Sequence, residues 1–87
     1  MIERGNQVDR FVGERLQLHR TLARESQTRL AAALHVTEMQ ISRYENGKER
    51  IPPQVLVAAA EHLRVKISSF IDDFDEVSGD FDKRESN

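Results

Sequence analysis

Polar side chains gather in the segment 37–47, which reads TEMQISRYENG. Within it, Gln40 carries amide donors and an amide acceptor, Arg43 carries a planar set of donors, and Glu38 carries acceptors only. In a major groove, glutamine pairs with adenine, arginine with guanine and glutamate with cytosine. Met39 adds an apolar side chain that suits the methyl group of thymine. The segment therefore has side chains able to distinguish base pairs.

Each of these side chains also has a simpler interpretation. Gln40 follows Thr37 by three residues and fits a capping box, so base readout and capping compete for one amide. Glu38 would favour the dipole of a helix without touching a base. Met39 would fill a gap in a core. Ser42 is small enough for a contact to a phosphate or a base, and equally for none.

The same segment has the features of a short helix over residues 38–46. Thr37 is suited to cap its start, and Gly47 can take the left-handed conformation that ends a helix. Ile41 and Tyr44 share one face and form a small apolar anchor. A helix with such an anchor and a polar outer face fits the major groove of DNA.

Four further helices are predicted, and no strand, because period-two alternation is absent and Gly and Pro stand at element ends. They are expected at 9–23, at 27–34, from Pro53 and from Ser68. Apolar residues spread widely around the first of them, which we expect to be buried over much of its girth. The fold class is all-α, with a flexible arm at 1–8, one domain at 9–74 and an acidic, disordered tail at 75–87.

The composition and motifs of the chain limit the classes of protein to which it can belong. The chain has 87 residues, of which 38% are hydrophobic and 32% charged, and it has no cysteine, so we expect one small domain without disulfides or thiolate metal sites. No apolar run approaches the ~20 residues that cross a bilayer. The spacing of His19, His35 and His62 fits no metal site, and no catalytic motif is present. We expect no enzyme, no cofactor, no metal and no membrane, and a cytoplasmic location.

Charge is divided unevenly along the chain. Residues 1–70 hold 11 Lys and Arg against 8 Asp and Glu, a net charge of +3, whereas residues 71–87 hold 2 against 7, a net charge of −5. A mildly basic folded part is the electrostatic footprint expected of a nucleic-acid binder. Lys48 and Arg50 would add long-range attraction to phosphates and hence salt dependence.

Several motifs together resemble the phage-repressor-like (Cro/Xre-type) helix-turn-helix regulators of bacteria and phages, over roughly residues 12–71. They are Gly13-Glu14-Arg15-Leu16, Arg20, Ser26-Gln27, Leu30-Ala31, Leu34, Val36-Thr37, Ile41 to Lys48, and Ala60 to Leu63. The resemblance implies a compact five-helix, lambda-repressor-like domain whose second and third helices bind double-stranded DNA. It also implies a homodimer on a pseudo-palindromic operator. The expected function is transcription regulation, as a repressor.

Side-chain chemistry and the resemblance together suggest roles for single residues. The side chains expected to contact DNA are Gln27, Thr37, Glu38, Met39, Gln40, Ser42, Arg43, Asn46 and Lys48. Of these, Gln27, Asn46 and Lys48 would set the register on phosphates, and Arg43 would reach a guanine or a phosphate. In similar proteins an arginine late in the first helix pairs with a glutamate late in the third, which implies a structural ion pair between Arg20 and Glu45.

A dimer interface is expected on the last helix. Its apolar side chains, Ile67, Phe70, Ile71 and Phe74, exceed what a short terminal helix needs for packing on its own domain. The chain also departs from the family, which usually has glycine after the first, second and fourth helices, where this chain has Arg24, His35 and Arg64. If the left-handed geometry is kept, each of these sites is strained by about 1 kcal/mol or more.

The acidic tail supports an alternative function. A negative segment with an isolated Phe81 could fold on a basic partner, as the tail of an antitoxin covers a toxin. It could also fold back on the basic face of its own domain and weaken DNA binding. Both alternatives keep the helical domain and differ from the first hypothesis only in the partner of the tail.

Overall fold

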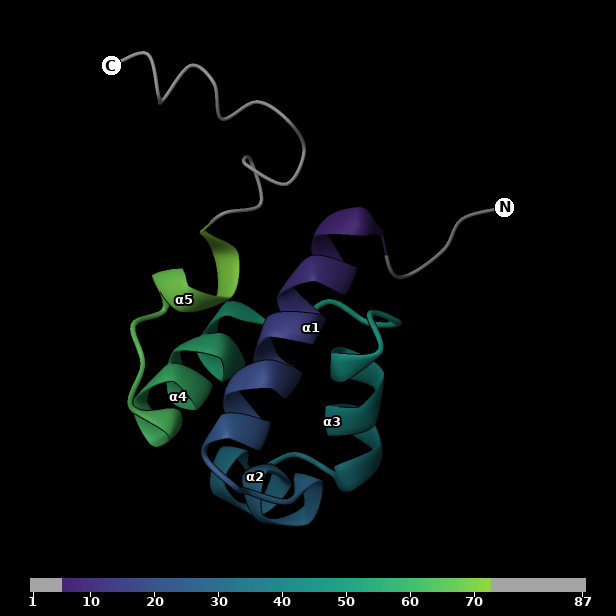
Figure 1. Ribbon diagram of the computed structural model, residues 1–87. Coiled ribbons are helices and arrows are strands. Elements are labelled where there is room, and N and C mark those ends of the chain that lie inside the picture. Colours follow the sequence, from purple (N-terminus) through teal and green to yellow (C-terminus); the bar gives the residue numbers. More distant parts are fainter. Residues whose placement is uncertain (1–5, 73–87) are drawn as a thin grey trace.

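The computed structural model describes residues 6–72, which form five helices and no strand (Figure 1). The helices are α1 (Gln7–Leu22), α2 (Gln27–Leu34), α3 (Glu38–Glu45), α4 (Pro53–Leu63) and α5 (Ser68–Ile71). The predicted all-α class is confirmed. Helix α1 begins two residues earlier than predicted because the side chain of Asn6 accepts a hydrogen bond from the backbone N–H of Asp9 at 2.8 Å and caps the helix. The predicted tail at 75–87, with Phe81, and the predicted interface residue Phe74 lie outside the described residues.

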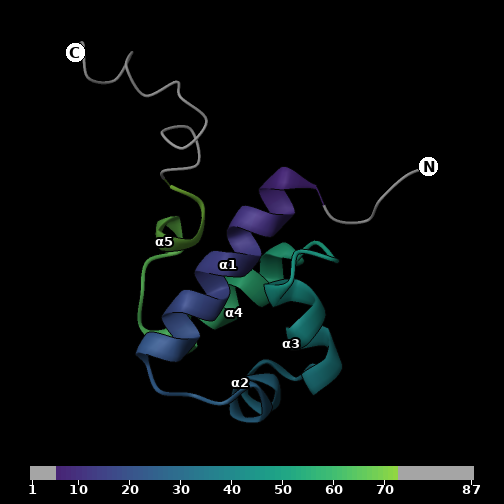
Figure 2. The ribbon, with the colours of Figure 1, turned by 45° about the vertical axis from the view of Figure 1, so that its right-hand side comes forward.

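Helix α1 runs through the middle of the fold, and α3 and α5 lie on opposite sides of it in two views (Figures 1 and 2). Helix α1 packs against α3, α4 and α5, while α2 packs against α3 and α4. The largest fully buried side chains come from four helices: Leu16, Leu30, Ile41 and Phe70. This shared core attaches the α2–α3 pair to the rest of the protein and leaves α3 at one edge.

Two predictions about apolar side chains are wrong. Helix α1 is not buried over much of its girth, because Val8, Leu18 and Leu22 are 47%, 43% and 67% exposed. Phe70 does not belong to an exposed interface, because it is fully buried and its ring meets that of His19 edge to face, with centroids 5.6 Å apart. The physical reason is the shortness of α5, which has only four residues and inserts one large side chain into the core of its own domain.

Helices α1, α2, α3 and α4 all end in the same backbone motif. In each, a left-handed residue is followed by an N–H that bonds back to the carbonyl five residues earlier, as in Glu25 to Arg20 and Val65 to Ala60. The left-handed residues are Arg24, His35, Gly47 and Arg64, with φ of 61°, 59°, 71° and 61°. The family's turn geometry is therefore kept without glycine at three of the four positions, and the strain expected from the sequence is present there.

Arg64→Gly is expected to raise the free energy of unfolding by about 1 kcal/mol, because glycine adopts φ of 61° without the clash of a Cβ atom. For a domain of this size that gain raises the melting temperature by roughly 4–8 °C. Arg29→Gly is the matched control, since the same exchange inside α2 should lower stability by about 1 kcal/mol. A thermal melt in which both variants lose stability would contradict the prediction.

Candidate nucleic-acid interface

The outward face of α3 carries most of the side chains expected to read bases. Glu38, Met39 and Arg43 are exposed, whereas Ile41, Tyr44 and Glu45 are buried on the other side of the helix. Met39 is 66% exposed, so it does not fill a gap in the core of the protomer. At about 100° per residue, the exposed residues occupy one continuous arc that also includes Ser42 and Asn46. The described chain thus presents a polar helical face with one apolar side chain.

Gln40 is held in the capping box at the start of α3. Its Oε1 accepts a hydrogen bond from the backbone N–H of Thr37 at 3.0 Å, and the Thr37 hydroxyl accepts one from the Gln40 N–H at 3.0 Å. The side chain is half-buried beside the exposed arc. Of the two interpretations open from the sequence, the structure contains the cap. The Thr37 hydroxyl also lies 3.3 Å from Gln40 Oε1, so both lone pairs of the amide oxygen face donors of Thr37, and a bidentate pair with adenine would have to displace one of them.

Glu45 lies beneath the exposed face in a nearly closed polar cluster. Its carboxylate is 1% exposed and accepts two hydrogen bonds from Arg20, from Nε at 2.6 Å and from Nη2 at 3.1 Å. The remaining guanidinium nitrogen, Arg20 Nη1, donates to the backbone carbonyl of Glu25 at 2.8 Å. The ion pair implied by the resemblance is thus present, and it connects the end of α1, the turn before α2 and the end of α3.

Gln27 joins this cluster, which the sequence did not indicate. Its Nε2 donates to Glu45 Oε1 at 2.9 Å, across the space between the start of α2 and the end of α3. An amide nitrogen has two N–H groups, so one donor remains for a phosphate. The same carboxylate therefore contacts Arg20 and also orients Gln27, the residue that was expected to contact the DNA backbone.

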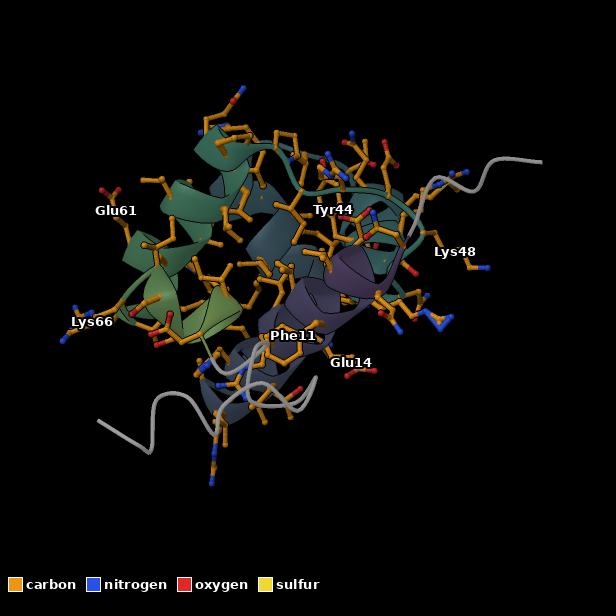
Figure 3. The ribbon with its side chains drawn as sticks, turned by 90° about the horizontal axis from the view of Figure 1, so that it is seen from above. Phe11, Glu14, Tyr44, Lys48, Glu61 and Lys66 are labelled. Atoms are coloured by element: carbon orange, nitrogen blue, oxygen red, sulfur yellow. The ribbon has the colours of Figure 1, made fainter. Side chains whose placement is uncertain are left out.

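Tyr44 anchors α3 from the inside (Figure 3). Burial, and after it the negative charge of Glu49, raises the pKa of its phenol above the usual 10.0. The side chain is 3% exposed. Tyr44 is therefore a neutral core residue that holds the helix against the domain and does not face outward with Met39 and Arg43.

Two glycines allow α3 to approach α1 closely. A Cβ atom at Gly13 would overlap the backbone carbonyl oxygen of Tyr44, and one at Gly47 would lie 2.7 Å from the Cα of Arg10. Both contacts involve backbone atoms that no side-chain rotation can move away. The position of α3 relative to α1 thus depends on the absence of side chains at these two positions.

Other polar contacts define the edges of the site. Arg50, expected to add long-range attraction, donates from Nε to the buried carboxylate of Asp9 at 3.2 Å, which partly offsets its charge. The side chain of Lys48 is exposed and makes no hydrogen bond or ion pair that the structure records, so its charge is available to a ligand. Asn46 Nδ2 lies 3.4 Å from Ser42 Oγ, at the long limit for a hydrogen bond.

His19 and His62 contact different parts of the fold. His19 is half-buried against Phe70, as expected for a residue at the edge of the core, and His62 Nε2 lies 2.9 Å from Glu25 Oε1. Residues 6–72 contain no group of three His, Cys, Asp or Glu side chains that could hold a metal ion. Within that range no helix is both long and apolar enough to cross a membrane.

A pair of helices joined by a left-handed turn, with the second helix exposing a polar face, defines the helix-turn-helix class of proteins. The family described as "Helix-turn-helix" matches residues 15–70, and the chain belongs to that family. The resemblance proposed from the sequence is thereby confirmed. The helix-turn-helix family is a DNA-binding class and not a class of enzymes.

Two relatives from bacteria are named as transcriptional regulators. The chain is 37% identical over 68 residues to an HTH-type transcriptional regulator of Sinorhizobium medicae, which covers 78% of this chain and 49% of that protein. It is also 37% identical over 68 residues to a transcriptional regulator in the ATPase CF(0) region of Rhodospirillum rubrum, covering 78% and 63%. The chain thus spans about half the length of the first relative.

Solved structures share the fold. The restriction-modification controller protein C.AhdI from Aeromonas hydrophila superimposes with a TM-score of 0.69 at 21% identity, over 72% of this chain and 96% of that one. The P22 c2 repressor, solved in complex with a synthetic operator, superimposes with a TM-score of 0.66 at 21% identity, over 71% and 94%. The five helices therefore have the same arrangement as these regulators.

Proposed function

We propose that this chain is a sequence-specific, double-stranded DNA-binding transcriptional regulator that acts as a repressor. The single observation that carries the proposal is the outward face of α3, which exposes Glu38, Met39 and Arg43 above a buried ion pair that holds the helix rigid. A preorganised helix with donors, acceptors and an apolar side chain on one arc is suited to the major groove. Membership of the helix-turn-helix family supports the same function.

Within this proposal, Arg43, Glu38 and Met39 read bases. Arg43 is suited to guanine, Glu38 to the amino group of cytosine, and Met39 to the methyl group of thymine. Gln40 acts within this proposal as a cap that presents the first turn of α3, because its Oε1 accepts hydrogen bonds from Thr37.

Phosphate contacts then set the register. Gln27 has one free amide N–H, Lys48 is an exposed cation, and the side chains of Asn46, Ser42 and Thr37 border the same arc. Contacts of this kind position a protein on DNA without carrying sequence information. The domain is small and acts in the cytoplasm on the nucleoid.

We infer a homodimer with α5 in its interface. Ile71 in α5 and Ile67 just before it are 47% and 40% exposed. Helix α5 lies on the opposite side of α1 from α3 (Figures 1 and 2). Phe70 is buried, so among the described residues of the predicted dimer interface only Ile67 and Ile71 can contact a second copy of the chain. A two-fold dimer would place two α3 helices in successive major grooves, about 34–36 Å apart.

Selection of bound sequences from random duplex DNA tests this function. The expected product is a pseudo-palindrome whose half-sites are separated by one helical turn, roughly 10–10.5 base pairs centre to centre. A selected single half-site would leave DNA binding intact and would overturn the dimer. Recovery of unselected DNA, with no enrichment of any sequence, would overturn sequence-specific regulation.

Arg43→Ala is expected to weaken binding to the selected operator by about 1–3 kcal/mol and to relax the preference at one base pair in each half-site. Lys66→Ala is the matched control, because Lys66 is also an exposed cation and lies at the opposite end of the molecule from Lys48 (Figure 3). Gel-shift titration at constant salt measures both. Equal affinities of Arg43→Ala and wild type would remove Arg43 from the interface.

A further inference from the structure

One hydrogen bond joins α2 to α3 on the outward side of the helix pair. The hydroxyl of Thr28 donates to Glu38 Oε2 at 2.8 Å, and both residues are exposed. Glu38 is the first residue of α3, and Thr28 is the second residue of α2. The bond thus connects the helix proposed to read bases with the helix that supports it, at the surface where DNA is proposed to lie.

A carboxylate at this surface needs a fixed orientation. DNA phosphates repel it, and it accepts hydrogen bonds but donates none, so the base edge that suits it best is the amino group of cytosine. An unanchored glutamate side chain also loses rotamer freedom when it is ordered, which weakens any contact it makes. A neutral donor bound to one carboxylate oxygen orders the side chain before DNA binds, so less rotamer entropy is lost in the complex. The other carboxylate oxygen remains free to accept a hydrogen bond from a base.

Thr28 is the donor that the helix pair offers for this purpose. Neither neighbouring amide is recorded as bonded to Glu38: Gln27 donates one N–H to the buried Glu45, and the oxygen of Gln40 accepts from Thr37. Glu38 Oε1 has no recorded partner, so it remains available to a ligand. The bond is also neutral on the Thr28 side, so it leaves the charge of Glu38 unchanged.

We propose that Thr28 is a positioning residue that sets the preference of Glu38 for cytosine in each half-site. Thr28 acts through Glu38 and needs no contact to a base. This inference rests on the proposed DNA-binding function. It goes beyond that function because it assigns part of the sequence preference to a side chain on the supporting helix.

The test compares sequence preferences, and not only affinities, of four variants. Thr28→Val keeps the shape of the side chain and removes the hydroxyl, and should reduce the preference for cytosine at one position about fivefold while other positions keep theirs. Thr28→Ser keeps the hydroxyl and should retain the wild-type preference. Glu38→Ala should lose the preference, and Thr28→Val added to Glu38→Ala should change nothing more.

The possible outcomes distinguish failure of the role of Thr28 from failure of the proposed DNA-binding function. A wild-type protein that selects no sequence overturns both. A wild-type protein that selects an operator, with Thr28→Val giving an identical profile, overturns only the role of Thr28. A uniform loss of affinity over all sequences in Thr28→Val also overturns it, because that result is the mark of a direct phosphate contact. Equal melting temperatures of wild type and Thr28→Val exclude unfolding as the cause.

Discussion

Arg20→Ala is expected to lower the free energy of unfolding by about 3–5 kcal/mol, because it leaves the buried Glu45 carboxylate without its counter-ion. Only the hydrogen bond from Gln27 would then remain on that carboxylate. A small domain has roughly 5–15 kcal/mol of stability in total, so such a loss removes a large share of it. Loss of DNA binding in this variant should follow from unfolding, and a thermal or urea melt measures the effect directly.

Comparison with Glu45→Ala sharpens this prediction. The guanidinium of Arg20 is 14% exposed and keeps its bond to the Glu25 carbonyl, so Glu45→Ala should be the milder change. The double variant should cost less than the sum of the two, because it leaves no buried charge unpaired. Arg29→Ala and Glu61→Ala remove exposed charges of each sign and should stay within about 0.5 kcal/mol of wild type. Additive single and double variants would show that the pair contributes nothing as a pair.

Gly13→Ala should destabilise the protein by about 3 kcal/mol or more, at the upper end of what overpacking costs. Helix propensity alone gives the opposite sign, since alanine is better than glycine inside a helix by about 1 kcal/mol. The tertiary contact decides, because the added methyl group would overlap the Tyr44 carbonyl, and α1 and α3 would have to separate. Calorimetric unfolding of the purified variant measures the loss.

Glu14→Ala is the control for this second prediction. It places the same residue one position further along α1, on the exposed side, where it should change stability by less than about 0.5 kcal/mol. A Gly13→Ala variant that is more stable than wild type would mean that α1 and α3 are further apart than described. The consequence for function is specific, since separation of these helices would displace the face proposed to bind DNA.

Local signals explain which elements could be predicted. Ser26 and Thr37 cap α2 and α3 through side chains that reach only three residues along the chain, so the start of each helix is encoded beside it. Longer-range features were harder. The exposure of Leu18 and Leu22 and the burial of Phe70 depend on which face of α1 receives α5, and amphipathic spacing in α1 alone does not carry that information.

In the candidate site, too, local features could be predicted from the sequence and contacts between distant residues could not. The arc of Glu38, Met39 and Arg43 follows from helical periodicity once the helix is placed, and family resemblance implied the pair of Arg20 with Glu45. Neither source indicated the contacts of Gln27 with Glu45 or of Thr28 with Glu38, which join residues 18 and 10 positions apart. From the sequence, the amide of Gln40 fitted both base readout and helix capping. Its hydrogen bond from the Thr37 N–H shows that it caps α3 in the fold.

The amino-acid sequence by itself determined the helical class, the helix caps and the residue types on the outer face of α3, because each depends on neighbours within about one helical turn. Tertiary structure alone decided which apolar side chains are covered, which amides are already engaged and how near α1 and α3 approach. Those outcomes depend on atoms brought together from distant parts of the chain. Protein interiors are packed about as densely as organic crystals, so the position of each side chain depends on its neighbours in the fold.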